Sequence, residues 1–129
     1  MTAMKLQKLV YYCQAWALVW DSAPLFEERI EAWANGPVVP ELYEAHRGQF
    51  EVDASTLDIV GDASKLSAEQ ARTVDAVLDF YGDKTPHWLS SLTHAERPWL
   101  EARSGLRPGE FSKRLITHAS MAEFYSSLT

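Results

Sequence analysis

The 129-residue sequence is poor in the features that mark secreted and membrane proteins. Its single cysteine, Cys13, excludes a disulfide within the chain and is typical of a reducing cytoplasm. Lysines and glutamines interrupt the apolar residues of its first segment, so this segment fits neither a signal peptide nor a membrane span. We therefore expect a cytoplasmic protein without membrane insertion.

Basic charge is also scarce. The formal net charge is −6, and the longest basic run is Lys113-Arg114. Binding to nucleic acid normally requires a basic face or a basic recognition helix. The sequence therefore argues against a nucleic-acid partner and, with it, against a role as a transcriptional autorepressor.

The residue patterns of common catalytic and metal sites are missing. No Cys-x-x-Cys or His-Glu-x-x-His motif joins the four histidines, so we expect no metal ligands and place these histidines at helix caps or on the surface. Ser90, Ser91 and His94 lie close together in the sequence but have no Gly-x-Ser-x-Gly elbow. Pro37 removes the N–H that a phosphate-binding loop would need after Gly36. We expect no catalytic residues and no cofactor. The four histidines are His46, His87, His94 and His118.

The first segment has the pattern of a helix. Thr2 can cap it, and its apolar residues recur at three- and four-residue spacing as far as about Trp20. Lys5 and Lys8 are polar, and Tyr12 lies off the apolar stripe. We therefore expect this helix at the centre of the core, with these three side chains exposed.

A sharp turn follows within the sequence Trp33-Ala34-Asn35-Gly36-Pro37-Val38-Val39-Pro40. Gly36 permits backbone angles that other residues resist, and Pro37 fixes its own φ and keeps Gly36 out of the helical region. Residues 25–33 alternate loosely, which indicates extended chain or a short hairpin. Pro40 suits the first turn of a helix over residues 41–46.

Further helices are predicted downstream by cap and stop signals. Ser67 and Gln70 form a capping-box pattern for a helix that ends at Gly82, and Thr85-Pro86 repeats a start signal. Pro98 opens another short helix, and Thr117 can cap the last one. Residues 50–65 and 104–112 have the character of loops. We predict a mainly α fold in one domain, residues 1–129: a compact helical bundle with a small extended or β-hairpin element around residues 25–39.

The aromatic residues exceed what a core of this size obviously needs, with five tryptophans and five tyrosines. Such rings either fill a core or anchor a protein interface. We favour the core for Trp33, Trp88 and Trp99 and leave Tyr11, Tyr12 and Tyr43 open between the two. Exposed aromatic rings would also suit a homodimer.

Several segments together resemble one known family, the SocA/GepA-like antitoxins of the Panacea domain, which occur in bacteria and phages. The resemblance begins with the helix Lys5-Leu6-Gln7-Lys8-Leu9-Val10-Tyr11-Tyr12 and includes the turn from Ile30 to Tyr43. It continues through Leu92-Thr93-His94, Pro98-Trp99 and Ile116-Thr117. The helix followed by the Gly-Pro turn is a fairly specific sign of this family, whereas either segment alone would be weak evidence.

The resemblance implies a non-enzymatic, mostly helical domain that binds and neutralises a toxin protein encoded beside it. Two alternatives stay open: an adaptor that delivers the toxin to an ATP-dependent protease, and an enzyme that acts on the toxin or its product. The sequence does not name the toxin.

The first helix and the Gly-Pro turn together provide the candidate residues for partner binding and for the structure of the turn. We expect Lys8→Glu or Tyr12→Ala to abolish protection against the toxin while leaving the fold intact. The candidate partner-binding residues are Lys5, Lys8, Tyr12, Asn35 and Tyr43, and the structural residues of the turn are Trp33, Gly36, Pro37, Val38 and Pro40.

Overall fold

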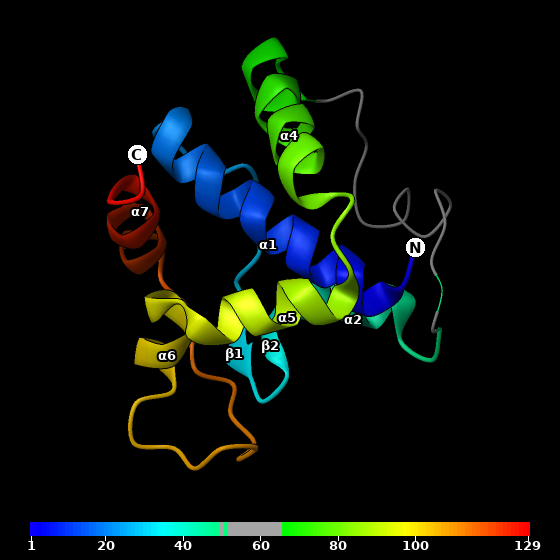
Figure 1. Cartoon of the computed structure of the whole chain (residues 1–129), viewed down its shortest axis with the longest axis vertical. Helices are drawn as coiled ribbons and strands as arrows, with labels where there is room; N and C mark the ends of the chain where they lie inside the picture. The colour runs from blue at the N-terminus through cyan, green and yellow to red at the C-terminus, as the bar shows by residue number, and fades with distance from the viewer. Residues whose placement is uncertain (50, 52–65) are drawn as a thin grey trace.

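The computed structural model describes residues 1–49, 51 and 66–129. Within these ranges the structure contains six helices and a two-stranded antiparallel sheet, which confirms the predicted mainly α fold with a small hairpin (Figure 1). The central helix α1 contacts most of the other elements. In chain order the elements are α1 (Ala3–Trp20), β1 (Glu31–Trp33), β2 (Gly36–Val38), α2 (Pro40–His46), α4 (Ala68–Tyr81), α5 (Pro86–Ala95), α6 (Arg97–Ala102) and α7 (His118–Ser126).

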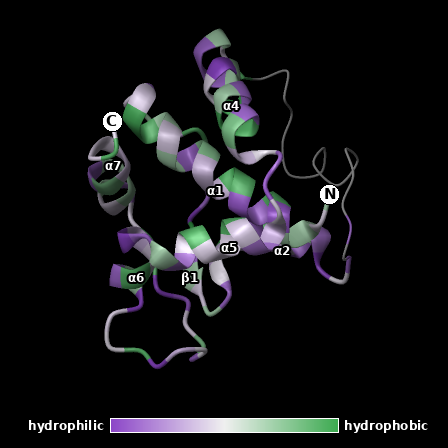
Figure 2. Ribbon diagram, viewed as in Figure 1, coloured by the Kyte–Doolittle hydropathy of each residue, from purple (hydrophilic) through white to green (hydrophobic). Residues whose placement is uncertain are grey.

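Helix α1 begins at the predicted cap, where the Thr2 hydroxyl accepts the N–H of Lys5 at 3.1 Å. Helices α4, α5 and α7 and strand β2 all pack against α1, so its buried residues are not confined to one apolar stripe. Hydrophilic and hydrophobic residues therefore alternate along α1 at the centre of the fold (Figure 2). The expectation that Lys8 and Tyr12 are exposed is wrong: their exposed fractions are 2% and 0%.

Two buried glutamines on α1 replace hydrogen bonds that a neighbouring strand would otherwise supply. The Gln14 carbonyl oxygen accepts the N–H groups of Leu25 (2.7 Å) and Phe26 (3.3 Å), and its amide nitrogen donates to the Phe26 carbonyl (2.9 Å). Two helical turns earlier, Gln7 accepts the N–H of Val39 (2.9 Å) and donates to the Val39 carbonyl (3.3 Å). The two side chains thus hold the extended chain at both ends of the hairpin region.

Each glutamine also fixes the role of a histidine. Because the Gln7 oxygen accepts from Val39, the Gln7 amide nitrogen must face His46 Nε2, 2.9 Å away. His46 Nε2 is then the acceptor, which requires its proton on Nδ1. Burial lowers the pKa of His46 and favours this neutral form. Gln14 makes the equivalent contact with His118 Nε2 at 3.3 Å.

The hairpin pairs Glu31 with Val38 and Trp33 with Gly36, as predicted for residues 25–39. A third segment, which the sequence did not predict, extends it along the β1 edge. The Ala32 N–H donates to the Arg114 carbonyl (2.8 Å), and the Ile116 N–H donates to the Ile30 carbonyl (2.9 Å). The chain near residues 114–116 therefore closes over the hairpin before α7 begins.

The predicted caps of the later helices are confirmed. Ser67 and Gln70 form the capping box of α4, and the hydroxyls of Thr85 and Thr117 cap α5 and α7. The core position predicted for Trp88 is wrong, because 41% of this residue is exposed, whereas Trp33 and Trp99 are partly buried. The loop predicted for residues 50–65 lies outside the described residues except for Glu51, which bridges to Thr2.

A cluster of tyrosines around one glutamate joins α1, α4 and α7 to the corner between α5 and α6. One carboxylate oxygen of Glu96, at the corner between α5 and α6, accepts hydrogen bonds from the hydroxyls of Tyr12 (2.7 Å) and Tyr125 (2.8 Å). The Tyr12 ring stacks on that of Tyr81, with centroids 4.1 Å apart, and the Trp16 indole N–H donates to the Tyr81 hydroxyl. Burial raises the pKa of Glu96, while the two tyrosine donors lower it. The cluster explains why Tyr12 belongs to the core.

Replacing Gln14 with leucine tests the glutamine support. Gln14→Leu leaves the backbone N–H groups of Leu25 and Phe26 without their acceptor, so we expect the free energy of unfolding to fall by about 2–3 kcal/mol. Gln70→Leu, which removes one bond of the α4 capping box, should cost only about 1 kcal/mol. Urea unfolding of both variants measures the difference, and equal losses would contradict the role given to Gln14.

Candidate functional site

The turn singled out in the sequence is the candidate site, and we call residues 31–40 the elbow. Gly36 has a φ of +124°, a region that favours glycine. A Cβ at Gly36 would lie 2.7 Å from Cε of Lys8 and 2.8 Å from its Nζ. Glycine is therefore needed twice, for the backbone angle and for the close approach of Lys8 from α1.

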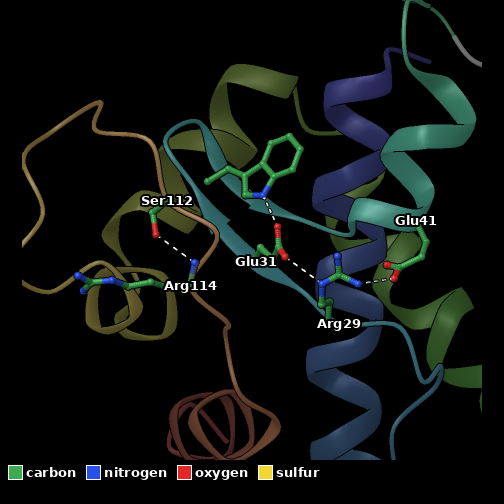
Figure 3. A network of polar contacts seen from close by, with 6 residues as sticks. Arg29, Glu31, Glu41, Ser112 and Arg114 are labelled. Carbon is green, nitrogen blue, oxygen red and sulfur yellow. Dashed lines mark hydrogen bonds and ion pairs between the residues drawn. The ribbon is translucent and has the colours of Figure 1, made fainter.

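One side of the elbow carries a network of charges (Figure 3). The buried Glu31 accepts the indole N–H of Trp33 (2.8 Å) with one oxygen and the Arg29 Nε–H (2.9 Å) with the other. Arg29 also binds the Glu41 carboxylate at 2.6 Å. Because Arg29 and Glu41 are both largely in solvent, their pair adds little stability by itself. The network instead sets the orientation of β1 relative to the start of α2.

Helices α5 and α6 support the opposite side of the elbow. The Trp99 indole N–H donates to the Trp33 carbonyl (2.9 Å), and Arg103 donates to the Ala32 carbonyl (3.0 Å). The His94 ring stacks on Trp99, with centroids 4.3 Å apart and an interplanar angle of 24°. The expected placement of His94 at a cap or on the surface missed this stacking, since its partners come from distant parts of the sequence.

Two basic nitrogen atoms beneath the elbow, Lys8 Nζ and His94 Nε2, form no hydrogen bond within the described residues. Within the described residues Lys8 forms no hydrogen bond or ion pair, and burial lowers its pKa to about 8. His94 Nε2 is buried and has no hydrogen-bond partner in this part of the chain. Burial is the largest cause of the lowered pKa of His94, and the charges of Lys8 and Arg103 lower this pKa further. A backbone hydrogen bond with Asn35 raises it in part. Sequence reasoning treated Lys8 as a surface lysine and so did not find this pair.

The five candidate partner-binding residues do not form one surface. Asn35 is exposed at the tip of the elbow. Tyr43 is partly exposed, and the centroid of its ring lies 5.0 Å from the centroid of the Trp33 ring. Lys5 is also accessible, but its ammonium donates to the Gly82 carbonyl beyond α4. Lys8 and Tyr12 are buried, so substituting either would disturb the core and the expectation of an intact fold no longer follows. A binding role for the five residues stays a prediction.

The residues assigned to the turn itself occupy consistent positions. Pro37 and Val38 are buried in β2, and Trp33 is half-buried between Tyr43 and the indole of Trp99. Pro40 is the first residue of α2. These positions agree with a structural role for the Gly-Pro sequence.

Other parts of the described chain contain weaker candidates for a functional site. An open cleft of about 410 Å³ lies between the end of α1 and the start of α4, lined by residues such as Trp20 and Arg72. No three potential metal ligands gather within the described ranges. In those same ranges, no helix combines the length and apolar character of a membrane span.

Gly36→Ala should lower the free energy of unfolding by about 2–4 kcal/mol, because the new methyl group meets Lys8 in a strained backbone region. The matched control is Gly48→Ala, where φ is +85° and nothing lies within 4 Å, so only strain of about 1 kcal/mol applies. Thermal or urea unfolding distinguishes the two. A loss at Gly36 no larger than that at Gly48 would refute the close approach of Lys8.

The buried ammonium of Lys8 should make stability depend on pH. Its folded pKa of about 8 lies below the ordinary 10.5, so the unfolded chain binds more protons between these values and stability rises with pH there. From pH 8 to about 9.5 we expect a gain of about 1 kcal/mol. Urea unfolding measures it, and Lys8→Met should lack it.

The pH range in which the effect of Lys8 can be measured has an upper limit. Burial raises the pKa of Tyr11, Tyr12 and Tyr125, which removes stability once free tyrosines ionise above about pH 10. Burial also raises the pKa of Cys13 to about 12, which removes stability once free thiols ionise near pH 9. The difference between wild type and Lys8→Met, rather than either slope alone, therefore isolates Lys8. If wild type and Lys8→Met show identical slopes, the ammonium is not buried.

Comparison with known proteins identifies a matching family. The family model described as "Antitoxin SocA-like, Panacea domain" matches residues 6–100, which include α1, the elbow, His94 and Trp99. No curated protein and no solved structure matches the chain significantly. The match spans well over half of the 129 residues and contains the elbow and its supports apart from Arg103. The chain belongs to the SocA-like antitoxin family of the Panacea domain.

Proposed function

We propose that this protein is an antitoxin that neutralises a toxin, encoded beside it, through direct protein–protein binding. The observation that carries the proposal is the family match over residues 6–100. An antitoxin of this kind acts by occupying a surface of its partner, so binding energy rather than bond chemistry is what the domain supplies. No enzymatic activity is part of the proposal.

We further propose that the toxin contacts the face formed by the elbow and α2. The exposed Asn35 and the partly exposed Tyr43 and Trp33 lie on this face. The rings of Tyr43 and Trp33 meet edge to face, with their centroids 5.0 Å apart. Tyrosine and tryptophan are the residue types that most often dominate binding energy at interfaces. The hydrogen bonds from Trp99 and Arg103 to the backbone of β1 hold this face rigid, which lowers the entropy lost on binding.

Tyr43→Ala should weaken binding of the neighbouring gene's toxin by about tenfold or more, since one aromatic anchor is worth about 2 kcal/mol. Isothermal titration calorimetry with the purified toxin measures the affinity. Phe80→Ala is the control, because Phe80 is 59% exposed on α4, which lies away from the hairpin (Figure 1). A melting curve for Tyr43→Ala checks that the Trp33 contact does not carry the fold. Equal affinities for the two folded variants would exclude the elbow–α2 face.

Titrating the antitoxin against toxin activity separates the mechanisms. Inhibition that is complete near equimolar ratio supports neutralisation by binding. Protection at a small fraction of the toxin concentration indicates turnover by an enzyme. Protection that disappears in cells without an ATP-dependent protease, together with a shortened toxin half-life, indicates an adaptor. Either of the last two results would overturn the proposal.

A further inference from the structure

The loop that follows α6 is positively charged in an otherwise acidic protein. Residues 103–114, which we call the Phe111 loop, contain four basic residues and one acidic residue, whereas the whole chain has a net charge of −6. The family model matches residues 6–100, so the Phe111 loop lies outside the matched part of the chain. Figure 1 draws the loop at the bottom of the molecule, beside the hairpin. The basic residues are Arg103, Arg107, Lys113 and Arg114, and the acidic residue is Glu110.

Hydrogen bonds hold the backbone of the Phe111 loop in place. The buried guanidinium of Arg103 donates to the carbonyls of Ala32, on β1, and of Glu110, within the loop. Arg114 joins the two ends of the loop by donating to the Ser104 carbonyl at 2.7 Å. A loop that is fixed in this way before a partner arrives loses less conformational entropy on binding.

The Phe111 loop presents an apolar ring beside its charges. Phe111 is 74% exposed, the largest exposed fraction among the large hydrophobic residues of the described chain. Lys113 Nζ lies 5.8 Å from the centroid of the Phe111 ring, and Arg107 and Lys113 are both exposed. A lone exposed apolar side chain is ordinary, but an aromatic ring together with arginine on a fixed loop is typical of a binding hot spot.

The Phe111 loop continues the face that we assign to the toxin. The exposed Leu115 pairs directly with Glu31 across the β1 edge. Opposing residues of an antiparallel pair point to the same side of a sheet, and so do residues two apart in one strand. Leu115, Glu31 and Trp33 therefore share one side, in agreement with the hydrogen bond from the Trp33 indole to Glu31. A partner that covers Trp33 can thus reach the Phe111 loop.

The charges select the chemistry of the partner. Proteins that bind nucleic acid typically make about 6–10 phosphate contacts, whereas this loop offers three exposed basic side chains, Arg107, Lys113 and Arg114. The net charge of −6 also opposes the approach of a nucleic acid or an anionic membrane. A small acidic patch on a protein needs only a few such cations.

We propose that the Phe111 loop binds an acidic patch of the toxin, with the Phe111 ring as its apolar anchor. This inference rests on the proposed antitoxin function and adds to it the charge of the surface that is recognised. The cations of the loop steer the toxin toward the elbow, and the ring is buried when the complex forms.

Calorimetric titration with the purified toxin, the product of the neighbouring gene, tests the inference on four single variants. At about 50 mM sodium chloride, Phe111→Ala and Lys113→Glu should each weaken binding about tenfold, since the first removes the anchor and the second reverses a charge. The matched controls are Phe80→Ala and Arg72→Glu, which change an exposed ring and an exposed cation on α4. Both controls should bind within about twofold of wild type.

Salt separates a charged contact from a structural effect. At about 0.5 M sodium chloride the loss in Lys113→Glu should shrink to about threefold or less, because salt screens exposed charges, whereas Phe111→Ala keeps its loss. If Tyr43→Ala weakens binding but both loop variants bind as their controls do, the inference is overturned and the proposed function stands. A wild type that does not bind the toxin overturns the proposed function itself. Tighter, Phe111-dependent binding to phosphatidylglycerol vesicles or to a DNA duplex overturns the assigned class of partner.

Discussion

The burial of α1 on nearly all of its sides is the constraint on which the rest of the structure depends. A helix enclosed in this way must satisfy every polar side chain that it carries, because water is not available as a partner. Gln7 and Gln14 meet the requirement by binding the backbone of the extended chain around the hairpin. Tyr12 meets it through Glu96. The polar residues of α1 therefore position the hairpin, the α5–α6 corner and α7, while its apolar residues supply the hydrophobic contacts.

Lys8 is the exception to this pattern. It occupies a comparable position on α1, but within the described residues it contacts the hairpin by packing alone. The fold tolerates the cost because α1 is held independently by the glutamines and by the tyrosine cluster. The stability of α1 therefore rests on side chains other than Lys8, and this separation allows Lys8 to retain an unusual environment.

Local signals predicted most of the secondary structure. Thr2, Ser67, Thr85 and Thr117 cap their helices as their side-chain chemistry requires, and the Gly36-Pro37 pair turns the chain where its backbone preferences demand. Burial was harder to predict. Helical spacing identifies one apolar stripe, but it does not report how many neighbours a helix will have, and so it misplaced Lys8 and Tyr12.

The candidate site was predicted only in part for a related reason. The elbow was recognised from its own residues, but its supports, His94 and Trp99, come from segments about sixty residues away. Periodicity and capping are local properties, and no local rule pairs Lys8 with His94. The pairing of residues 114–116 with β1 was missed on the same grounds.

That pairing also determines how another protein can recognise the hairpin. Many small sheets bind partners by accepting an extra strand at a free edge, where unpaired backbone groups serve as the template. Here residues 114–116 occupy the β1 edge, while β2 is buried and contains Pro37, which has no N–H to offer. Strand addition is therefore unavailable at the elbow. A partner must read its side chains, so recognition here depends on residue identity rather than on backbone shape.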